Sequence, residues 1–399
     1  RLSASCRRRQ KSTPQLPAGH AASLSWPPSW LNAKEKSFAG TVMEQAMPER
    51  KTNIHLLLTF LILILPGLMI AFPTNAGAAA QMTVTDALGR NVVVPESPEH
   101  VICSGAGCLR LLTYLQAEDR VVAVDDMEKR EVPVDPRPYA MANPQFKGLP
   151  LFGEFRGQDN PELIATLEPA PQVIFKTFAG MGTDPSELQQ KIGIPVVALV
   201  YGDLGDYKED LYQSLRIMGK LLGKTERAEA VIDYFNETIQ NLKYRTASVA
   251  AADKTSCYVG GIAFKGPHGF QSTEPTYPPF MYTRAKNVAY NPEKSYGTLS
   301  HASVAKEKII AWNPEVVFLD LSSVASAPGF SALEELKTDP AYQYLDAVKA
   351  GRVYGVMPYN WYAQNFGATL ADAFYVGKIL YPERFADIDP AAQADEIFQ

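Results

Sequence analysis

A short pattern occurs twice in this chain, far apart in sequence. The first copy spans residues 162–169 and the second spans residues 307–314, and both read Glu-x-Ile-x-x-(Leu/Trp)-x-Pro. A short run of β-branched and aromatic residues follows each copy, at 173–175 and 316–319. A repeat with this spacing predicts two similar lobes, each carrying one acidic residue at an equivalent position.

The N-terminal region has to be set aside before the fold is considered. Residues 47–80 are typical of a secretory signal peptide, because Met47 is followed by a short basic region, an apolar run and small residues. A membrane anchor is the alternative, but the apolar run is short for a span of about 20 residues and Pro66-Gly67 interrupts it. We therefore expect cleavage near residue 80 and a periplasmic protein. Residues 1–46 show no hydrophobic periodicity, and we expect them to be an upstream extension outside the fold.

The remaining chain is long enough for two domains of ordinary size. A net charge of −5 and the lack of a Lys/Arg-rich patch argue against nucleic-acid binding. Cys103, Cys108 and Cys257 are too few for a disulfide framework. Cys103 and Cys108 flank an expected strand-to-helix turn, so a disulfide stays open, although small buried side chains are the favoured interpretation.

Strands and helices alternate along the chain, which predicts βαβ units and a mostly parallel sheet. The pattern indicates a hairpin over residues 83–94, a strand at 100–103, a helix at 109–115 and a strand from 121. In the first repeat we expect Asn160 to cap a helix with Pro161 in its first turn, and in the second we expect Ser303 to be the cap.

A long segment without proline, residues 204–250, separates the two repeats. Its later part keeps a helical period, which predicts a continuous connecting helix over about 224–250. The expected fold is therefore α/β, with an N-terminal lobe (81–223) and a C-terminal lobe (251–399), both with mostly parallel sheets. A helix of this kind would stiffen the join, so we expect lobe closure to be small.

These features together resemble a known family. The opening residues 85–92 (Thr-Asp-Ala-Leu-Gly-Arg-Asn-Val), the strand before Cys103, the paired Glu-x-Ile motifs and the connecting helix are similar to the helical-backbone class of periplasmic substrate-binding proteins. The tail, with Tyr359-Asn-Trp-Tyr362 and residues 375–385, looks like an iron-compound subgroup of that class. The resemblance implies a protein that serves an ABC importer of iron–siderophore complexes, haem or cobalamin. It covers nearly all of residues 82–399.

The resemblance also implies a role for the repeated glutamates. In the family, one acidic residue on each lobe docks into arginine pockets of the membrane permease, and the matching residues here are Glu162 and Glu307. A glutamate in the first turn is also favourable against the helix dipole, by about 0.3–1 kcal/mol, and needs no partner to explain it.

The ligand is expected in a cleft outside the carboxyl ends of the strands. The loops expected there are rich in glycine and aromatic residues, which suit a large, partly apolar chelate, and Arg156 can pair with its carboxylates. The candidate ligand-binding residues are Phe155, Arg156, Phe178, Tyr201, His268, Phe270, Tyr277, Tyr282, Tyr296, Tyr359, Asn360, Trp361 and Tyr362.

Direct capture of a bare metal ion is a weaker hypothesis, because no pair among His100, His268 and His301 has ligand spacing. Enzyme motifs are incomplete: Gly223-Lys-Thr225 lacks the first glycine of a phosphate loop, and Arg110 stands where a dinucleotide fingerprint needs glycine. Asp125 and Asp126 are interpreted as a solvated loop.

The sequence thus predicts a monomeric binding protein, without a cofactor or catalytic residues, that carries an iron chelate, haem or corrinoid to an ABC permease. Its only expected contact with the membrane is through that permease. Two alternatives stay open: a chelatase-like or metallocluster-type enzyme of related architecture, and a membrane-retained sensor.

Overall fold

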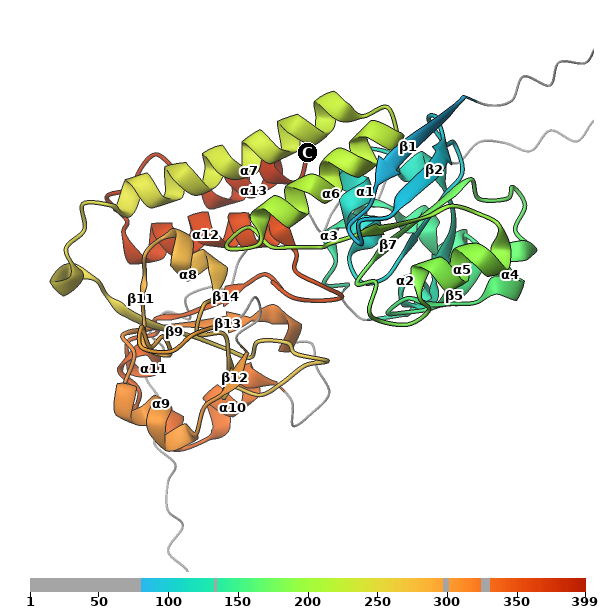
Figure 1. Cartoon of the computed structure of the whole chain (residues 1–399). Helices are drawn as coiled ribbons and strands as arrows, with labels where there is room; N and C mark the ends of the chain where they lie inside the picture. Colours follow the sequence, from blue (N-terminus) through green and yellow to red (C-terminus); the bar gives the residue numbers. More distant parts are fainter. Residues whose placement is uncertain (1–79, 133–134, 297–300, 324–330) are drawn as a thin grey trace, which may run out of the picture. The chain divides into compact units, whose positions relative to one another are not determined.

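Two separate parallel sheets form the framework of the computed structural model, which describes residues 80–132, 135–296, 301–323 and 331–399 (Figure 1). The expected upstream extension and almost all of the expected signal peptide lie outside the described residues. Within the described part of the chain, every helix is too short or too polar to cross a membrane.

The first lobe is built on a six-stranded sheet with the order β6-β5-β4-β3-β7-β8, in which only the β5–β6 pair is antiparallel. The strands are β3 (Val101–Ser104), β4 (Val121–Asp125), β5 (Leu151–Glu154), β6 (Gln158–Asp159), β7 (Val173–Thr177) and β8 (Val196–Leu199). The helices are α1 (Cys108–Tyr114), α2 (Asp126–Lys129), α3 (Pro138–Ala142), α4 (Pro161–Ala165) and α5 (Pro185–Ile192). Strands β3 and β7 are buried along their whole length, as expected where helices cover both faces of a parallel sheet.

The second lobe has a four-stranded parallel sheet with the order β11-β9-β13-β14. Its strands are β9 (Ser256–Gly260), β11 (Lys286–Asn287), β13 (Val316–Asp320) and β14 (Val353–Val356), and β10 (Ser272–Thr273) pairs with β12 (Ala302–Ser303) beside them. The helices are α8 (Pro278–Tyr282), α9 (Lys306–Trp312), α10 (Ala332–Thr338) and α11 (Asp346–Lys349). The predicted α/β fold with two mostly parallel sheets is confirmed.

The sequence repeat corresponds to a structural repeat. Helix α4 leads into β7 in the first lobe, and α9 leads into β13 in the second, and each of these strands is flanked on both sides in its sheet. Asn160 caps α4 as predicted, accepting hydrogen bonds from the backbone N–H groups of Glu162 and Leu163. The predicted cap Ser303 is wrong, because Ser303 lies in β12 and the N-cap of α9 is Ala305.

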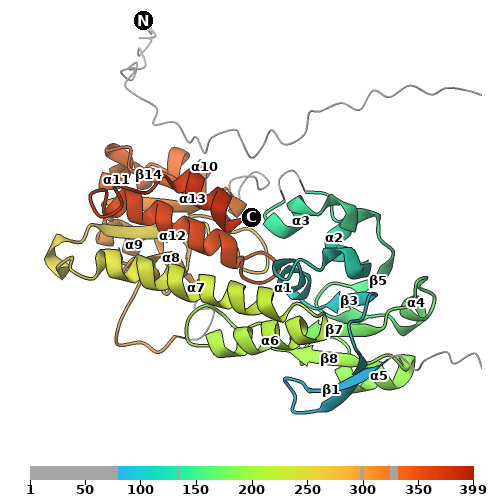
Figure 2. The ribbon, with the colours of Figure 1, turned by 90° about the horizontal axis from the view of Figure 1, so that it is seen from above.

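The expected connecting helix is α7 (Thr225–Thr246), with 22 residues. The preceding segment forms a separate helix, α6 (Lys208–Leu221), because Gly223 takes a left-handed conformation with φ 65° between them. Helix α12 (Phe366–Leu380) packs against α7, and α13 (Pro390–Ile397) packs on α12 (Figures 1 and 2).

One hydrophobic core runs through both lobes and the helices that join them. Leu215 of α6, Phe235 of α7, Phe366 of α12 and Phe318 of β13 all belong to this core. Two smaller cores lie within the individual lobes, one around Ile102 and one around Tyr258.

The predicted N-terminal hairpin is formed by β1 (Gln81–Thr85) and β2 (Asn91–Pro95). Its turn covers the edge strand β8: Ala87 N–H donates to the carbonyl of Ala198, and Asp86 accepts from Ala198 N–H. Unpaired strand edges favour association with other chains, so the turn protects the sheet on this side.

Candidate ligand-binding site

The segment 359–365, which follows β14, reaches from the second lobe to the first. The hydroxyl of Tyr362 accepts a 3.0 Å hydrogen bond from the backbone N–H of Arg156, and it donates to the carboxylate of Asp125. The rings of Phe155 and Tyr362 have centroids 6.5 Å apart. Phe155, Arg156 and Tyr362 are therefore brought together from two lobes, while their role in ligand binding stays a prediction.

Arg110 of α1 holds this segment in place, and it was not among the predicted site residues. Its side chain is 2% exposed and donates to the backbone carbonyls of Gln364 (2.8 Å) and Trp361 (3.1 Å). It also donates to the hydroxyl of Tyr201, which in turn donates to the carbonyl of Gln364 at 2.6 Å. A charged residue within the otherwise apolar run Leu109-Arg-Leu-Leu112 is the sequence signal that marks it.

The loops of the first lobe rest on a buried ion pair. Lys176 of β7 donates to Asp159 at 2.6 Å and to the carbonyl of Gly157 at 2.9 Å, while Ser104 donates to Asp159 at 2.6 Å. Both charged side chains are fully buried. The pair therefore fixes the β5–β6 turn, which carries Phe155 and Arg156, relative to the loop after β3.

Unfavourable backbone conformations gather in the same loops. Arg156, Phe178, Tyr362 and Ala363 all have positive φ, at 61°, 52°, 52° and 74°. Such conformations cost on the order of 1–3 kcal/mol each for bulky residues and tend to persist at functional sites.

Asp125 is buried, so its interpretation as part of a solvated acidic loop was wrong. Its side chain ends β4, is 4% exposed and caps α2 by accepting from Met127 N–H. Burial raises the pKa of Asp125 to about 7, and the hydrogen bond from Tyr362 opposes that rise only in part.

Several predicted ligand residues lie in the protein core. Phe270 packs edge-on against Tyr258 and Tyr342, and Tyr277 packs against Phe280 and Tyr359. The hydroxyl of Tyr359 donates to buried Glu274. The predicted ligand residues whose side chains are buried are Tyr201, Phe270, Tyr277, Tyr282 and Tyr359, so in this structure they offer little surface to a ligand.

The other predicted residues keep some exposure. Phe178 is 40% exposed and its ring stacks on Tyr201 with centroids 6.0 Å apart. Asn360 and Trp361 are half-buried in the segment that Arg110 holds, and Asn360 donates to the carbonyl of Ala263. Tyr296 is half-buried too, but its contacts are with Tyr290 and Asn291 of its own loop.

His268 lies in the loop after β9, next to His301, although the two histidines are far apart in the sequence. The ring centroids of His268 and His301 are 5.7 Å apart. Burial, followed by the electrostatic influence of the neighbouring His268, lowers the pKa of His301.

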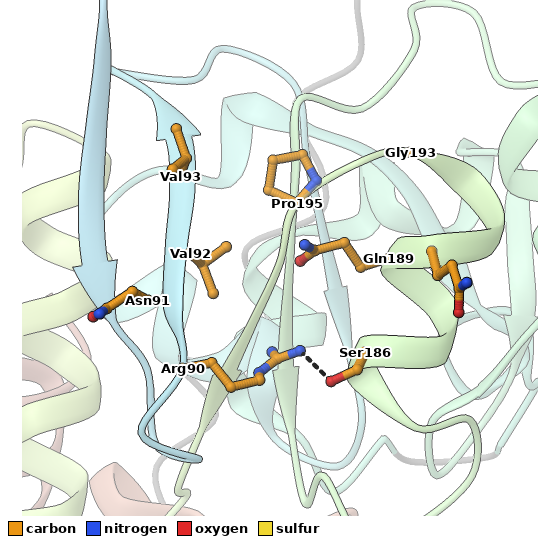
Figure 3. Close-up of a pocket in the computed structure, with 9 residues that line it drawn as sticks. Arg90, Asn91, Val92, Val93, Ser186, Gln189, Gly193 and Pro195 are labelled. Carbon is orange, nitrogen blue, oxygen red and sulfur yellow. Dashed lines mark hydrogen bonds between the residues drawn. The ribbon is translucent and has the colours of Figure 1, made fainter.

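A hollow of about 490 Å³ lies elsewhere, between β2, α5 and the start of β8 (Figure 3). Arg90 lines it, but this side chain is already bound to Ser186, Asp86 and the carbonyl of Val196. Pro195, at the amino end of β8, also lines it. The hollow is therefore at the opposite end of this strand from the predicted ligand loops.

Glu162 and Glu307 are both exposed in the first turn of their helices. Within the described residues, neither glutamate takes part in an ion pair, whereas the neighbouring Lys306 binds Asp339. Cys103, Cys108 and Cys257 are buried free thiols, so the disulfide left open by the sequence is not formed.

Comparisons with known proteins agree with this architecture. The sequence profile described as periplasmic binding protein matches residues 101–359. The molybdate-binding protein MolA of Haemophilus influenzae is 22% identical over 346 residues, covering 81% of this chain and 91% of that protein.

Solved structures are similar over most of the chain. A periplasmic solute-binding protein from Veillonella parvula has a TM-score of 0.61 at 20% identity, covering 80% of this chain and 92% of that one. The structure of MolA with molybdate has a TM-score of 0.60 at 21% identity, covering 80% and 97%. The petrobactin-binding protein YclQ of Bacillus subtilis has a TM-score of 0.51 at 17% identity, covering 80% and 99%.

Proposed function

Because this chain belongs to the periplasmic binding protein family, we propose that it captures a metal chelate between its two lobes and delivers it to the permease of an ABC transporter. The chelate class is that of iron–siderophore complexes, haem or corrinoids. Proteins of this family bind solutes, which argues against the chelatase-like alternative.

The meeting of Phe155 and Arg156 with Tyr362 carries this proposal. It combines aromatic faces from both lobes with a guanidinium that forms no ion pair within the described residues. Arg130 adds a second cation, with its Cζ 4.3 Å from the centroid of Phe155. A planar chelate that carries carboxylates or phenolates suits such a surface. The relative named for petrobactin is consistent with it.

An oxyanion such as molybdate is a second candidate. Burial of Tyr201, Phe270, Tyr277, Tyr282 and Tyr359 leaves fewer aromatic groups for a large ligand than the sequence predicted, while the cation of Arg156 stays exposed. The relative MolA is named for molybdate.

Tryptophan fluorescence distinguishes the two candidates. Trp361 lies beside Tyr362, whereas Trp312 packs near Tyr258 in the second lobe. Titration with ferric catecholate, haemin, cobalamin and molybdate should quench the tryptophan fluorescence saturably either with a metal chelate or with the oxyanion. Trp361→Phe should remove the signal and Trp312→Phe should keep it. Saturable turnover, or no binding of any of these compounds, would contradict the proposal.

We further propose that Glu162 and Glu307 dock the protein to the permease. The double variant Glu162→Ala/Glu307→Ala should lose ligand uptake into cells or vesicles that contain the transporter, with ligand affinity unchanged. The matched control is Glu187→Ala/Glu334→Ala, since these exposed glutamates lie in the first turns of α5 and α10. Equal loss of uptake in both double variants, or loss of affinity in the first, would contradict the docking role.

The proposed location in the periplasm rests on cleavage of residues 47–80. N-terminal sequencing of the exported protein should give a start near Gln81. A product that keeps the apolar run 56–72 would instead support the membrane-retained alternative.

A further inference from the structure

Two histidines meet at the carboxyl side of the second lobe's sheet. His268 comes from the loop after β9, and His301 directly precedes β12. Their ring centroids are 5.7 Å apart, with an angle of 36° between the planes. The ring of Phe264 stacks on His301 with centroids 4.4 Å apart and planes at 6°, so this imidazole is held on one face.

Hydrogen bonds determine which ring nitrogen of each histidine carries the proton. His268 Nε2 lies 2.6 Å from the carbonyl oxygen of Phe264, which can only accept, so Nε2 is the donor. The hydroxyl of Ser272 gives its one proton to the carbonyl of Ile262 at 2.7 Å. It therefore accepts from His301 Nε2 at 2.8 Å. In both neutral rings Nδ1 is left with a lone pair.

We propose that His268 and His301 bind a divalent transition-metal ion through their Nδ1 atoms. Metal-bound histidines usually donate their other N–H to a carbonyl or similar acceptor, which orients the ring, and Phe264 and Ser272 supply those acceptors here. With metal–nitrogen bonds of about 2.1 Å, two imidazoles on one ion have ring centres on the order of 5–6 Å apart. The observed separation agrees with this geometry.

The ligand set selects the kind of ion. Imidazole nitrogen suits Ni²⁺, Cu²⁺ and Zn²⁺, whereas Ca²⁺ and Mg²⁺ need oxygen ligands. The described residues contain no cluster of three or more His, Cys, Asp or Glu side chains arranged for a metal. Water or a small anion must therefore complete the coordination, and the ion is exchangeable. The test of this site is independent of the proposed transport function, because metal alone can be titrated without ligand or permease.

Calorimetric titration of the full chain with Ni²⁺, Cu²⁺ and Zn²⁺ tests this site. One ion should bind per chain, and His268→Ala and His301→Ala should each weaken binding by about tenfold or more. Ser272→Ala keeps both imidazoles but frees the ring of His301, and should weaken binding by about 10–100-fold. His100→Ala is the control, since His100 precedes β3 in the first lobe. No binding, or unchanged binding in the His268→Ala/His301→Ala double variant, would overturn the proposal.

A second measurement needs no substitution. Nitrogen NMR shifts of the metal-free protein near neutral pH should show the Nε2–H tautomer for both His268 and His301, and Ni²⁺ or Zn²⁺ should shift both Nδ1 resonances. An Nδ1–H tautomer on either ring would contradict the assignment.

Discussion

The guanidinium of Arg110 donates a 2.8 Å hydrogen bond to the carbonyl of Gln364, although 254 residues separate them in the chain. Because Trp361 and Gln364 are held from α1, the position of Tyr362 beside Phe155 depends on a buried residue of the other lobe. The geometry of the proposed ligand site thus depends on Arg110, a buried residue beneath the loops that form it.

Replacing Arg110 should destabilise the whole protein. Arg110→Met removes hydrogen bonds from a charged donor to buried carbonyls and should lower the free energy of unfolding by about 2–4 kcal/mol in urea denaturation. Arg130→Met is the control, because the Arg130–Asp126 ion pair is exposed, and its effect should stay within about 0.5 kcal/mol. Similar small effects for both variants would show that Arg110 does not hold the segment 359–365.

Alanine substitutions at two glycines with nearly the same φ can distinguish the cost of backbone strain from the cost of steric overlap. Gly89 and Gly107 have φ of 73° and 75°; a Cβ on Gly89 meets nothing, whereas one on Gly107 would overlap the ring of Tyr201. Gly89→Ala should cost about 1 kcal/mol of unfolding free energy. Gly107→Ala should cost roughly 3 kcal/mol or more, because Tyr201 must move and loosen its bond with Arg110. Equal costs in thermal or urea unfolding would mean that the ring of Tyr201 can yield.

The buried pair Lys176–Asp159 should show strong coupling. Lys176→Met leaves the Asp159 carboxylate buried without its cation and should cost about 3–5 kcal/mol of unfolding free energy. Adding Asp159→Asn should recover part of that loss, which a double-mutant cycle measures. Lys147→Met breaks the exposed pair with Glu131 and should change stability by less than about 0.5 kcal/mol. Simple additivity at Lys176 and Asp159 would contradict the coupling.

Asp320 should make stability fall as pH rises. Burial raises its pKa from the ordinary value of 3.8 to about 7, against hydrogen bonds from Ser322 and Tyr359. The folded protein therefore binds more protons than the unfolded chain between about pH 4 and pH 7, and the free energy of unfolding declines over that window. Asp320→Asn should flatten this decline in urea titrations.

The control for Asp320 is an aspartate with the opposite shift. The hydrogen bond with Arg245 lowers the pKa of Asp387 to about 2, so this carboxylate is ionised throughout the window. Asp387→Asn should leave the slope between about pH 5 and pH 7 unchanged, because Asp387 is ionised there in both the folded and the unfolded chain. A slope that is unaltered by Asp320→Asn would show that Asp320 is not a source of the decline.

Local patterns in the sequence predicted the local structure well. The hairpin of β1 and β2, the strands β3 and β4 and the helix α7 follow from alternation or helical periodicity, and Asn160 caps α4 because its partners are the next residues. Ser303 failed as a cap because pairing of β12 with β10, a contact between distant segments, claims it instead.

Long-range contacts explain what the sequence did not predict in the site. An aromatic residue in a glycine-rich loop can face water or the core. The side chain of Tyr359 lies in the core, where its hydroxyl donates a hydrogen bond to Glu274. The role of Arg110 depends on carbonyls of residues 361–364, and the pairing of His268 with His301 depends on the path of the loops around β10 and β12. These contacts join residues that are far apart in the chain, so local residue spacing could not predict them.

The core that contains Phe235, Phe318 and Phe366 has a consequence for the protein as a whole. If either repeat were produced alone, it would expose to water the apolar surface that α7 and α12 now cover. Neither half would then be expected to persist as a soluble protein, and the intact chain should unfold in a single cooperative step. The two lobes thus share a sequence pattern but are expected to fold only together, as one cooperative unit.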